Sequence, residues 1–351
     1  MRTAHSLAST ISEHINRNLI WLLIATYAVA AFWPALGLCI RRASLGDIAL
    51  DEKGTKVMLL SVMLGSLLFN AGIGIRASDL QDVRRNKWAL IDGLMARLMV
   101  PMAFVFSVGH MMRFWHNPVE AQIILVGLAL VISMPIAGSS TAWVQNANGN
   151  LALCLSLVVA STLLSPFITP IVLQLIGKMA SGEYARAVHV LESHNTGLFL
   201  ILWVALPALL GIMVRGMLHE ARMDLVRPYL KLVNSLVLLL LNYSNASLTL
   251  PQIVARPDPD FLFLTMGMAV GLCVTAFASG HVLARLLETD QGQRISLIYG
   301  LGMNNNGTGL VLASLVLGDY PRVMLPIIFY NLIQHLVAGI VHFALCHRTA
   351  K

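Results

Sequence analysis

Charged side chains are scarce in this sequence of 351 residues, and their scarcity excludes the commonest class of protein. Asp, Glu, Lys and Arg make up 12% of the chain and hydrophobic residues make up 57%, whereas a soluble domain carries about 25% charged residues. A soluble chain of this length could not bury all of the resulting uncharged stretches in one hydrophobic core. The composition therefore predicts an integral membrane protein in contact with the lipid bilayer.

Motifs of enzymes and of nucleic-acid binding are also missing. The four cysteines contain no CxxC pair and imply no disulfide framework. No HExxH helix, Walker loop, Ser-His-Asp arrangement or GxGxxG after a strand occurs. The net charge of +7 comes from basic residues in loops between apolar stretches, without interleaved aromatics. The sequence thus predicts neither an enzyme, nor a bound cofactor other than a candidate sodium ion, nor a nucleic-acid partner.

Ten apolar stretches have the length of membrane-spanning helices, which need about 20 residues. Nine of them contain no Asp, Glu, Lys or Arg, and the remaining one, the third along the chain, contains only Asp92 and Arg97. We predict an all-α membrane protein with ten transmembrane helices. The stretches are Leu19–Leu38, Val57–Ile75, Trp88–Met111, Ala121–Gln145, Leu151–Gly177, Leu198–Val214, Leu232–Val254, Phe261–Ala284, Ile295–Gly318 and Val323–Cys346.

The ends of the chain and the loops predict the orientation. Leu7, Ile11 and Ile15 recur at helical spacing in residues 1–18, which favours an interfacial amphipathic segment. With ten spans both termini share a side, and the loops on that side hold most of the Lys and Arg residues. By the positive-inside rule both termini face the cytoplasm. We expect the protein in the cell (inner) membrane; the sequence does not define its oligomeric state.

Two spans are interrupted by small and polar residues at corresponding positions. The fourth contains the cluster 134–150 and the ninth contains the cluster 300–309, so each is the fourth of five spans. Matching interruptions in two halves are typical of an inverted repeat with a binding site near the midplane. We predict a 5+5 inverted repeat with halves 19–178 and 196–346, forming one integrated membrane domain. The alternative is that both clusters are packing kinks of small residues.

The interruptions supply candidate ligands. Pro135 removes a backbone donor and Gly302 weakens its helix, and unwound backbone in a membrane survives only where it faces protein, water or a ligand. Freed carbonyls suit a cation, whereas half-helix N-termini suit an anion. Asn70, in the second span, either forms an interhelical hydrogen bond or contacts the substrate. The candidate substrate and ion contacts are Asn70, Arg97, Ser139, Ser140, Thr141, Gln145, Asn304, Asn305, Asn306 and Thr308.

Several of these motifs resemble one known family. The break at Pro135, the Ser-Thr-Leu-Leu-Ser-Pro run 161–166 with Pro170, and Gly302-Met303-Asn304-Asn305 resemble the bile acid:sodium symporter family, in which the last run reads E-x-G-M-Q-N. The resemblance extends over about 57–341. It implies a core bundle of spans 3–5 and 8–10, in which broken spans 4 and 9 cross, and a panel bundle of spans 1, 2, 6 and 7. It also implies sodium-driven transport of an organic anion by alternating access.

The resemblance also implies two sodium sites, and several of their ligands are replaced here. A serine-asparagine pair falls on Ser140 and Thr141, and a glutamine falls on Asn304; with Met303 these are the candidate sodium ligands that remain. The other ligand positions lack suitable oxygen atoms: the shared glutamate falls on Gly300, a third-span glutamine on Ala96, and a serine and a threonine on Cys154 and Val158.

Arg97, next to Ala96, is the only basic residue deep in a span. Intramembrane arginine costs at least about 2.5–3.5 kcal/mol, so it indicates a functional role. Our hypothesis is that the guanidinium stands in for one bound cation and favours an anion. The predicted function is a secondary active transporter of a small organic anion, sodium-coupled by resemblance. The alternatives are a ligand sensor that does not transport, and a sodium-independent carrier, either a uniporter or proton-coupled.

Overall fold

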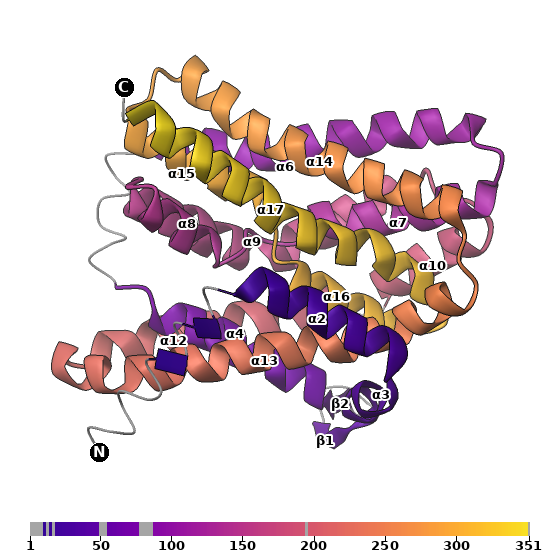
Figure 1. Ribbon diagram of the computed structural model, residues 1–351, viewed down its shortest axis with the longest axis horizontal. Helices are drawn as coiled ribbons and strands as arrows, with labels where there is room; N and C mark the ends of the chain where they lie inside the picture. The colour runs from indigo at the N-terminus through magenta and orange to yellow at the C-terminus, as the bar shows by residue number, and fades with distance from the viewer. Residues whose placement is uncertain are drawn as a thin grey trace. The chain divides into compact units, whose positions relative to one another are not determined.

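The computed structural model describes residues 10–11, 14–15, 18–48, 55–76, 87–193 and 196–349, and they are almost entirely helical (Figure 1). Five helices are each long and apolar enough to cross a membrane, or six spans if one bent pair counts as one. The five are Lys87–Phe114, Leu151–Gly177, Thr196–Met217, Pro259–Leu286 and Pro321–Leu345. The predicted helical membrane protein is therefore confirmed at this level. Of the predicted interfacial segment 1–18, only residues 10, 11, 14, 15 and 18 lie among the described residues.

The chain divides into two compact units, residues 1–76 with 201–257, and residues 77–200 with 258–351. In the first unit α13 packs against α2, α3 and α4, and α4 packs against α12 and the π-helical turn η3. Gly72 and Gly211 let α4 and α12 touch, because a Cβ on Gly72 would lie 2.2 Å from the carbonyl oxygen of Ala208. Its elements are α2 (Leu19–Phe32), α3 (Ala35–Arg42), β1 (Ser44–Ile48), β2 (Thr55–Met58), α4 (Leu59–Ile73), η3 (Ile201–Ala205), α12 (Leu206–Met217) and α13 (Glu220–Ala255).

The first unit departs from the sequence prediction in two places. The expected straight span Leu19–Leu38 bends by 92° between α2 and α3. Pro34 lies at the bend, where it has no N–H to donate and restricts the residue before it. After α3 the chain forms the antiparallel pair β1–β2, in which Asp47 lies opposite Lys56, so the expectation of an all-α chain omitted a hairpin.

In the second unit α14 packs against α15, α6 and α17, and Figure 1 shows α6, α14 and α17 as long helices. Asparagine or aspartate side chains cap the starts of α7, α9, α15 and α16 by accepting backbone N–H groups. The elements are α6 (Lys87–Met111), η2 (Met112–Phe114), α7 (Pro118–Ser133), α8 (Ser140–Asn146), α9 (Leu151–Gly177), α10 (Gly182–Ser193), α11 (Thr196–Leu200), α14 (Pro259–Leu286), α15 (Gln291–Gly302), α16 (Asn306–Val316), η4 (Pro321–Val323) and α17 (Met324–Thr349).

Candidate functional site

Two interruptions of helical structure meet inside the second unit. The first separates α7 from α8 at 134–139, and the second separates α15 from α16 at 303–305. Ile136 and Asn304 form an antiparallel bridge. Ala137 N–H donates to the Met303 carbonyl at 3.0 Å, and Asn305 N–H donates to the Pro135 carbonyl at 2.8 Å. Each unwound segment therefore pairs with the other in place of a continuing helix.

Side chains from α9 satisfy further backbone groups of the first interruption. Thr169 Oγ1 donates to the Ser133 carbonyl at 2.6 Å. Ser161 Oγ accepts the N–H of Ile136 at 3.0 Å. Both hydroxyls are buried, so these hydrogen bonds replace ones that a continuous helix would have made. They hold the first interruption against α9.

Residues of α17 serve the second interruption in the same way. Tyr330 donates its hydroxyl to the Gly302 carbonyl at 3.1 Å. Gln334 Oε1 accepts the N–H of Asn304 at 3.0 Å. Asn305 Oδ1 then accepts the N–H of Thr308 at 3.3 Å and caps α16. Tyr330 and Thr169 were not among the residues singled out from the sequence.

Arg97 joins the two interruptions. Its side chain projects from α6 and is 7% exposed. Nη1 donates to the Ile132 carbonyl at 3.4 Å, and Nη2 donates to the Met134 carbonyl and, at 3.0 Å, to Asn304 Oδ1. Among the residues that the structure describes, no carboxylate forms an ion pair with Arg97. The guanidinium is thus a buried positive charge whose partners are uncharged oxygen atoms from both interruptions.

The remaining predicted residues of the first cluster lie on α8 or at its start. Ser140 is buried, and its Oγ donates to the Ala137 carbonyl at 2.7 Å and lies 3.4 Å from Cys154 Sγ. Thr141 Oγ1 donates to the Gly138 carbonyl at 2.8 Å. Ser139 and Gln145 are exposed. The structure therefore brings Ser140 and Thr141 to the first interruption, where both hydroxyls already serve its backbone.

Two polar side chains of the second cluster have unused hydrogen-bonding capacity. Asn306 and Thr308, in the first turn of α16, are 1% and 0% exposed. Among the described residues, neither Asn306 Oδ1 nor Thr308 Oγ1 has a hydrogen-bond partner. Buried polar atoms are rarely left this way, and such exceptions require an explanation. Both atoms lie at the start of α16.

Asn70 belongs to the first unit and makes a different contact. Its side-chain amide, on α4, donates to the Leu230 carbonyl of α13 at 2.8 Å. This bond links two helices of one unit, which is the interhelical alternative considered from the sequence. The other predicted residues, from Arg97 to Thr308, lie in the second unit.

Two interrupted helices that meet inside a helical membrane protein are typical of membrane transporters. Comparison with known proteins identifies the family. The model of the Sodium Bile acid symporter family matches residues 61–256, more than half of the chain, and the chain belongs to this family.

The chain is also similar to three known proteins. The protein YbaS of Bacillus subtilis is 26% identical over 69% of this chain and 74% of its own length. The sodium-dependent transporter YocS, also of Bacillus subtilis, is 24% identical over 73% of each chain. The probable chloroplastic sodium/metabolite cotransporter BASS2 of rice is 21% identical over 73% of this chain and 56% of its own length.

Proposed function

We propose that this protein is a secondary transporter that moves a small organic anion across the membrane by alternating access, and that Arg97 takes the place of one bound cation. The observation that carries the proposal is the buried guanidinium, which donates to the Ile132 carbonyl at the end of α7, to the Met134 carbonyl of one interruption and to Asn304 Oδ1 of the other. Carbonyl and amide oxygens are the ligands that a hard cation such as sodium would use. A fixed positive charge at this point favours an anionic substrate.

The sodium positions implied by the family resemblance support the same proposal. Gly300 offers no side chain where the family has glutamate, and a Cβ added there would meet Leu157 Cδ1 at 3.1 Å. Cys154 and Val158 are buried on α9 and offer a thiol and an isopropyl group instead of hydroxyls. Ser140, Thr141, Met303 and Asn304 are the oxygen ligands that we assign to any sodium ion that still binds. We therefore propose that transport depends less on sodium here than in the relatives that are named as sodium-dependent transporters.

We further propose ten spans in a 5+5 inverted repeat, with halves 19–178 and 196–346. Two observations support this architecture. Every predicted apolar stretch is mostly helical, formed by one helix or by two or three consecutive helical elements. The first unit gathers the stretches that the resemblance assigns to the panel, and the second gathers those of the core. The basic loops favour cytoplasmic termini and the cell (inner) membrane.

We assign substrate contact to the polar groups beside the interruptions. Asn306 Oδ1 and Thr308 Oγ1 have no hydrogen-bond partner among the described residues, Ser139 and Gln145 are exposed, and Asn305 caps α16. The N-terminus of a helix attracts negative charge. A carboxylate or sulfonate with a polar body suits such a surface.

Reconstitution into proteoliposomes tests transport against sensing. Radiolabelled taurocholate and pyruvate serve as a large and a small organic-anion probe. We expect saturable accumulation of at least one of them inside vesicles, with a smaller rate for Thr308→Val. Saturable binding to the detergent-purified protein without entry into vesicles would instead establish a ligand sensor.

A further inference from the structure

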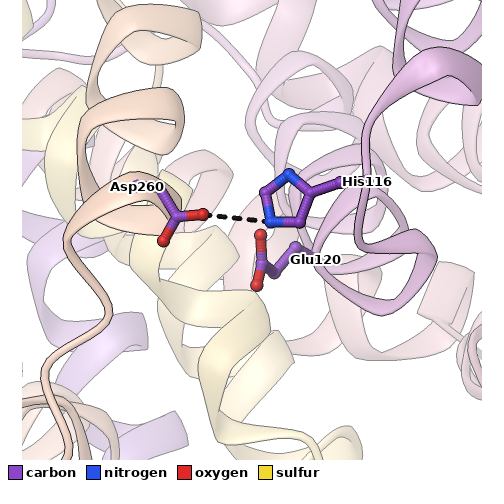
Figure 2. A group of neighbouring side chains, drawn as sticks. All are labelled: His116, Glu120 and Asp260. Atoms are coloured by element: carbon purple, nitrogen blue, oxygen red, sulfur yellow. Dashed lines mark ion pairs between the residues drawn. The ribbon is translucent and has the colours of Figure 1, made fainter.

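A second group of polar side chains lies far along the helices from the interruptions, where α6 ends and α7 and α14 begin. His116 lies between η2 and α7, Glu120 is in the first turn of α7, and Asp260 is in the first turn of α14. Figure 2 shows the three side chains pointing toward one another from two chain segments. The proposed transport mechanism uses none of them.

The spacing of these groups suits a metal ion. One ligand atom from each residue lies within 4.8 Å of the other two, and His116 Nε2 is 3.1 Å from Asp260 Oδ2. Ligands about 2.0–2.2 Å from a metal, at tetrahedral or octahedral angles, lie roughly 3.0–3.5 Å apart. The His116–Asp260 pair already has this separation. To bring Glu120 to the same separation, the other two side chains need to shift by about 1 Å. His116 and Asp260 can do so because their side chains are 62% and 50% exposed.

Glu120 is the fixed member of the group. The residue is 3% exposed, and its carboxylate accepts from Trp115 Nε1 at 2.8 Å and from Asn117 Nδ2 at 2.5 Å. These donors orient the carboxylate and leave further lone pairs on its oxygens, as outer-shell partners of metal ligands do. No Lys or Arg side chain pairs with Glu120 in the described part of the chain. A buried carboxylate without a countercharge is costly, and a cation between it and Asp260 would offset that cost.

The donor set selects the kind of ion. One imidazole nitrogen and two carboxylates suit zinc and other first-row divalent metals, whereas calcium and magnesium prefer oxygen ligands alone. A further carboxyl group, that of Asp258, lies at the start of the same helix. We propose that His116, Glu120 and Asp260 form a binding site for a first-row divalent metal ion, which ties the start of α7 to the start of α14.

Isothermal titration of the purified full-length protein with zinc tests the site. The protein is used in detergent, after removal of any polyhistidine tag and treatment with chelator, and magnesium serves as the comparison ion. We expect one zinc ion per chain, with no saturable magnesium binding under the same conditions. His116→Ala and Asp260→Asn should each weaken zinc binding at least about tenfold.

The controls separate ligand loss from misfolding. His110→Ala removes another exposed histidine, whose ring bonds the Phe106 carbonyl at the end of α6, and should leave zinc affinity unchanged. Thermal unfolding without metal should match the wild type for His116→Ala, while added zinc should raise the unfolding temperature of the wild type alone. Absence of one-to-one zinc binding to the wild type, or equal affinity in all variants, would overturn the proposal. Neither outcome depends on transport.

Discussion

The two interruptions at the crossing are satisfied in different ways. At the first, backbone carbonyls receive hydrogen bonds from Arg97 and from the hydroxyl of Thr169. At the second, uncharged groups of α17 bind the backbone, and two side chains at the start of α16 keep oxygen atoms without partners among the described residues. Backbone carbonyls at the first are thus bound by the protein's own cation, whereas the second keeps hydrogen-bonding capacity although Arg97 also donates to Asn304 Oδ1.

From this difference we propose separate tasks for the two segments. A bound sodium ion and a guanidinium would compete for the same oxygens at the first interruption, because both are cations that carbonyls attract. An anionic substrate would approach the second, where a helix begins and side-chain dipoles are unused. The following variants are ordered from the largest expected effect to the smallest.

Replacement of Arg97 should have the largest effect, because it affects both interruptions at once. A lost hydrogen bond to a charged group costs about 1.5–3 kcal/mol, which corresponds to roughly 10–100-fold in a rate or an affinity. We expect Arg97→Met to lower anion uptake by at least about tenfold. Arg97→Lys, which keeps the charge but loses the planar fork, should be intermediate. If Arg97→Met takes up the anion at the wild-type rate, Arg97 has no role in the transport mechanism.

Gly302→Ala tests how tightly the second interruption packs. A Cβ at Gly302 would lie 2.4 Å from the ring of Phe277, so that ring or the α15 backbone must move. Such overpacking costs about 1–3 kcal/mol. We expect a lower thermal unfolding temperature in detergent. Gly267→Ala, on α14 with nothing near its added Cβ, is the control and should be at least as stable as the wild type.

A pair of hydroxyl deletions compares the two interruptions directly. Thr169→Val removes the bond to the Ser133 carbonyl, and Tyr330→Phe removes the bond to the Gly302 carbonyl. Each should cost about 0.6–1.5 kcal/mol, because one buried carbonyl loses its donor. Thermal unfolding of both variants measures this cost. Stability equal to the wild type in either variant would contradict the hydrogen-bond assignment at that interruption.

Thr308→Val should have the smallest effect on stability. Its Oγ1 is fully buried without a partner in the described part of the chain, so removing it leaves no other group unsatisfied. The unfolding temperature should be unchanged or higher, while anion uptake falls. A loss of stability as large as that of Thr169→Val would show that Oγ1 supports the fold instead of the substrate.

The family and the helical membrane class were predicted from the sequence and are confirmed. Apolar length and residue order determine both, and Leu151–Gly177 is helical over the whole predicted stretch. The bend at Pro34 was missed, because hydrophobicity alone does not distinguish a straight span from a broken one. The β1–β2 hairpin was also missed. The ten-span inverted repeat and its cytoplasmic termini stay predictions.

The candidate site was predicted in its residues but not in its contacts. Asn304 was named because it lies in the interruption of the ninth span, and Arg97 because basic side chains are rare inside spans. Their hydrogen bond, and those of Thr169 and Tyr330, join residues 28 to 207 positions apart in the sequence. Local patterns contain no information on pairs at such separation, so these partners required the structure.

Initial uptake of a transported anion with sodium chloride replaced by choline chloride tests the role of Arg97 most directly. Because the guanidinium already occupies oxygen atoms at the crossing of the two interruptions, wild-type proteoliposomes should retain at least about half of their uptake without sodium, and Arg97→Met should lose it. Strict dependence of wild-type uptake on sodium would contradict the proposal that Arg97 replaces a bound cation.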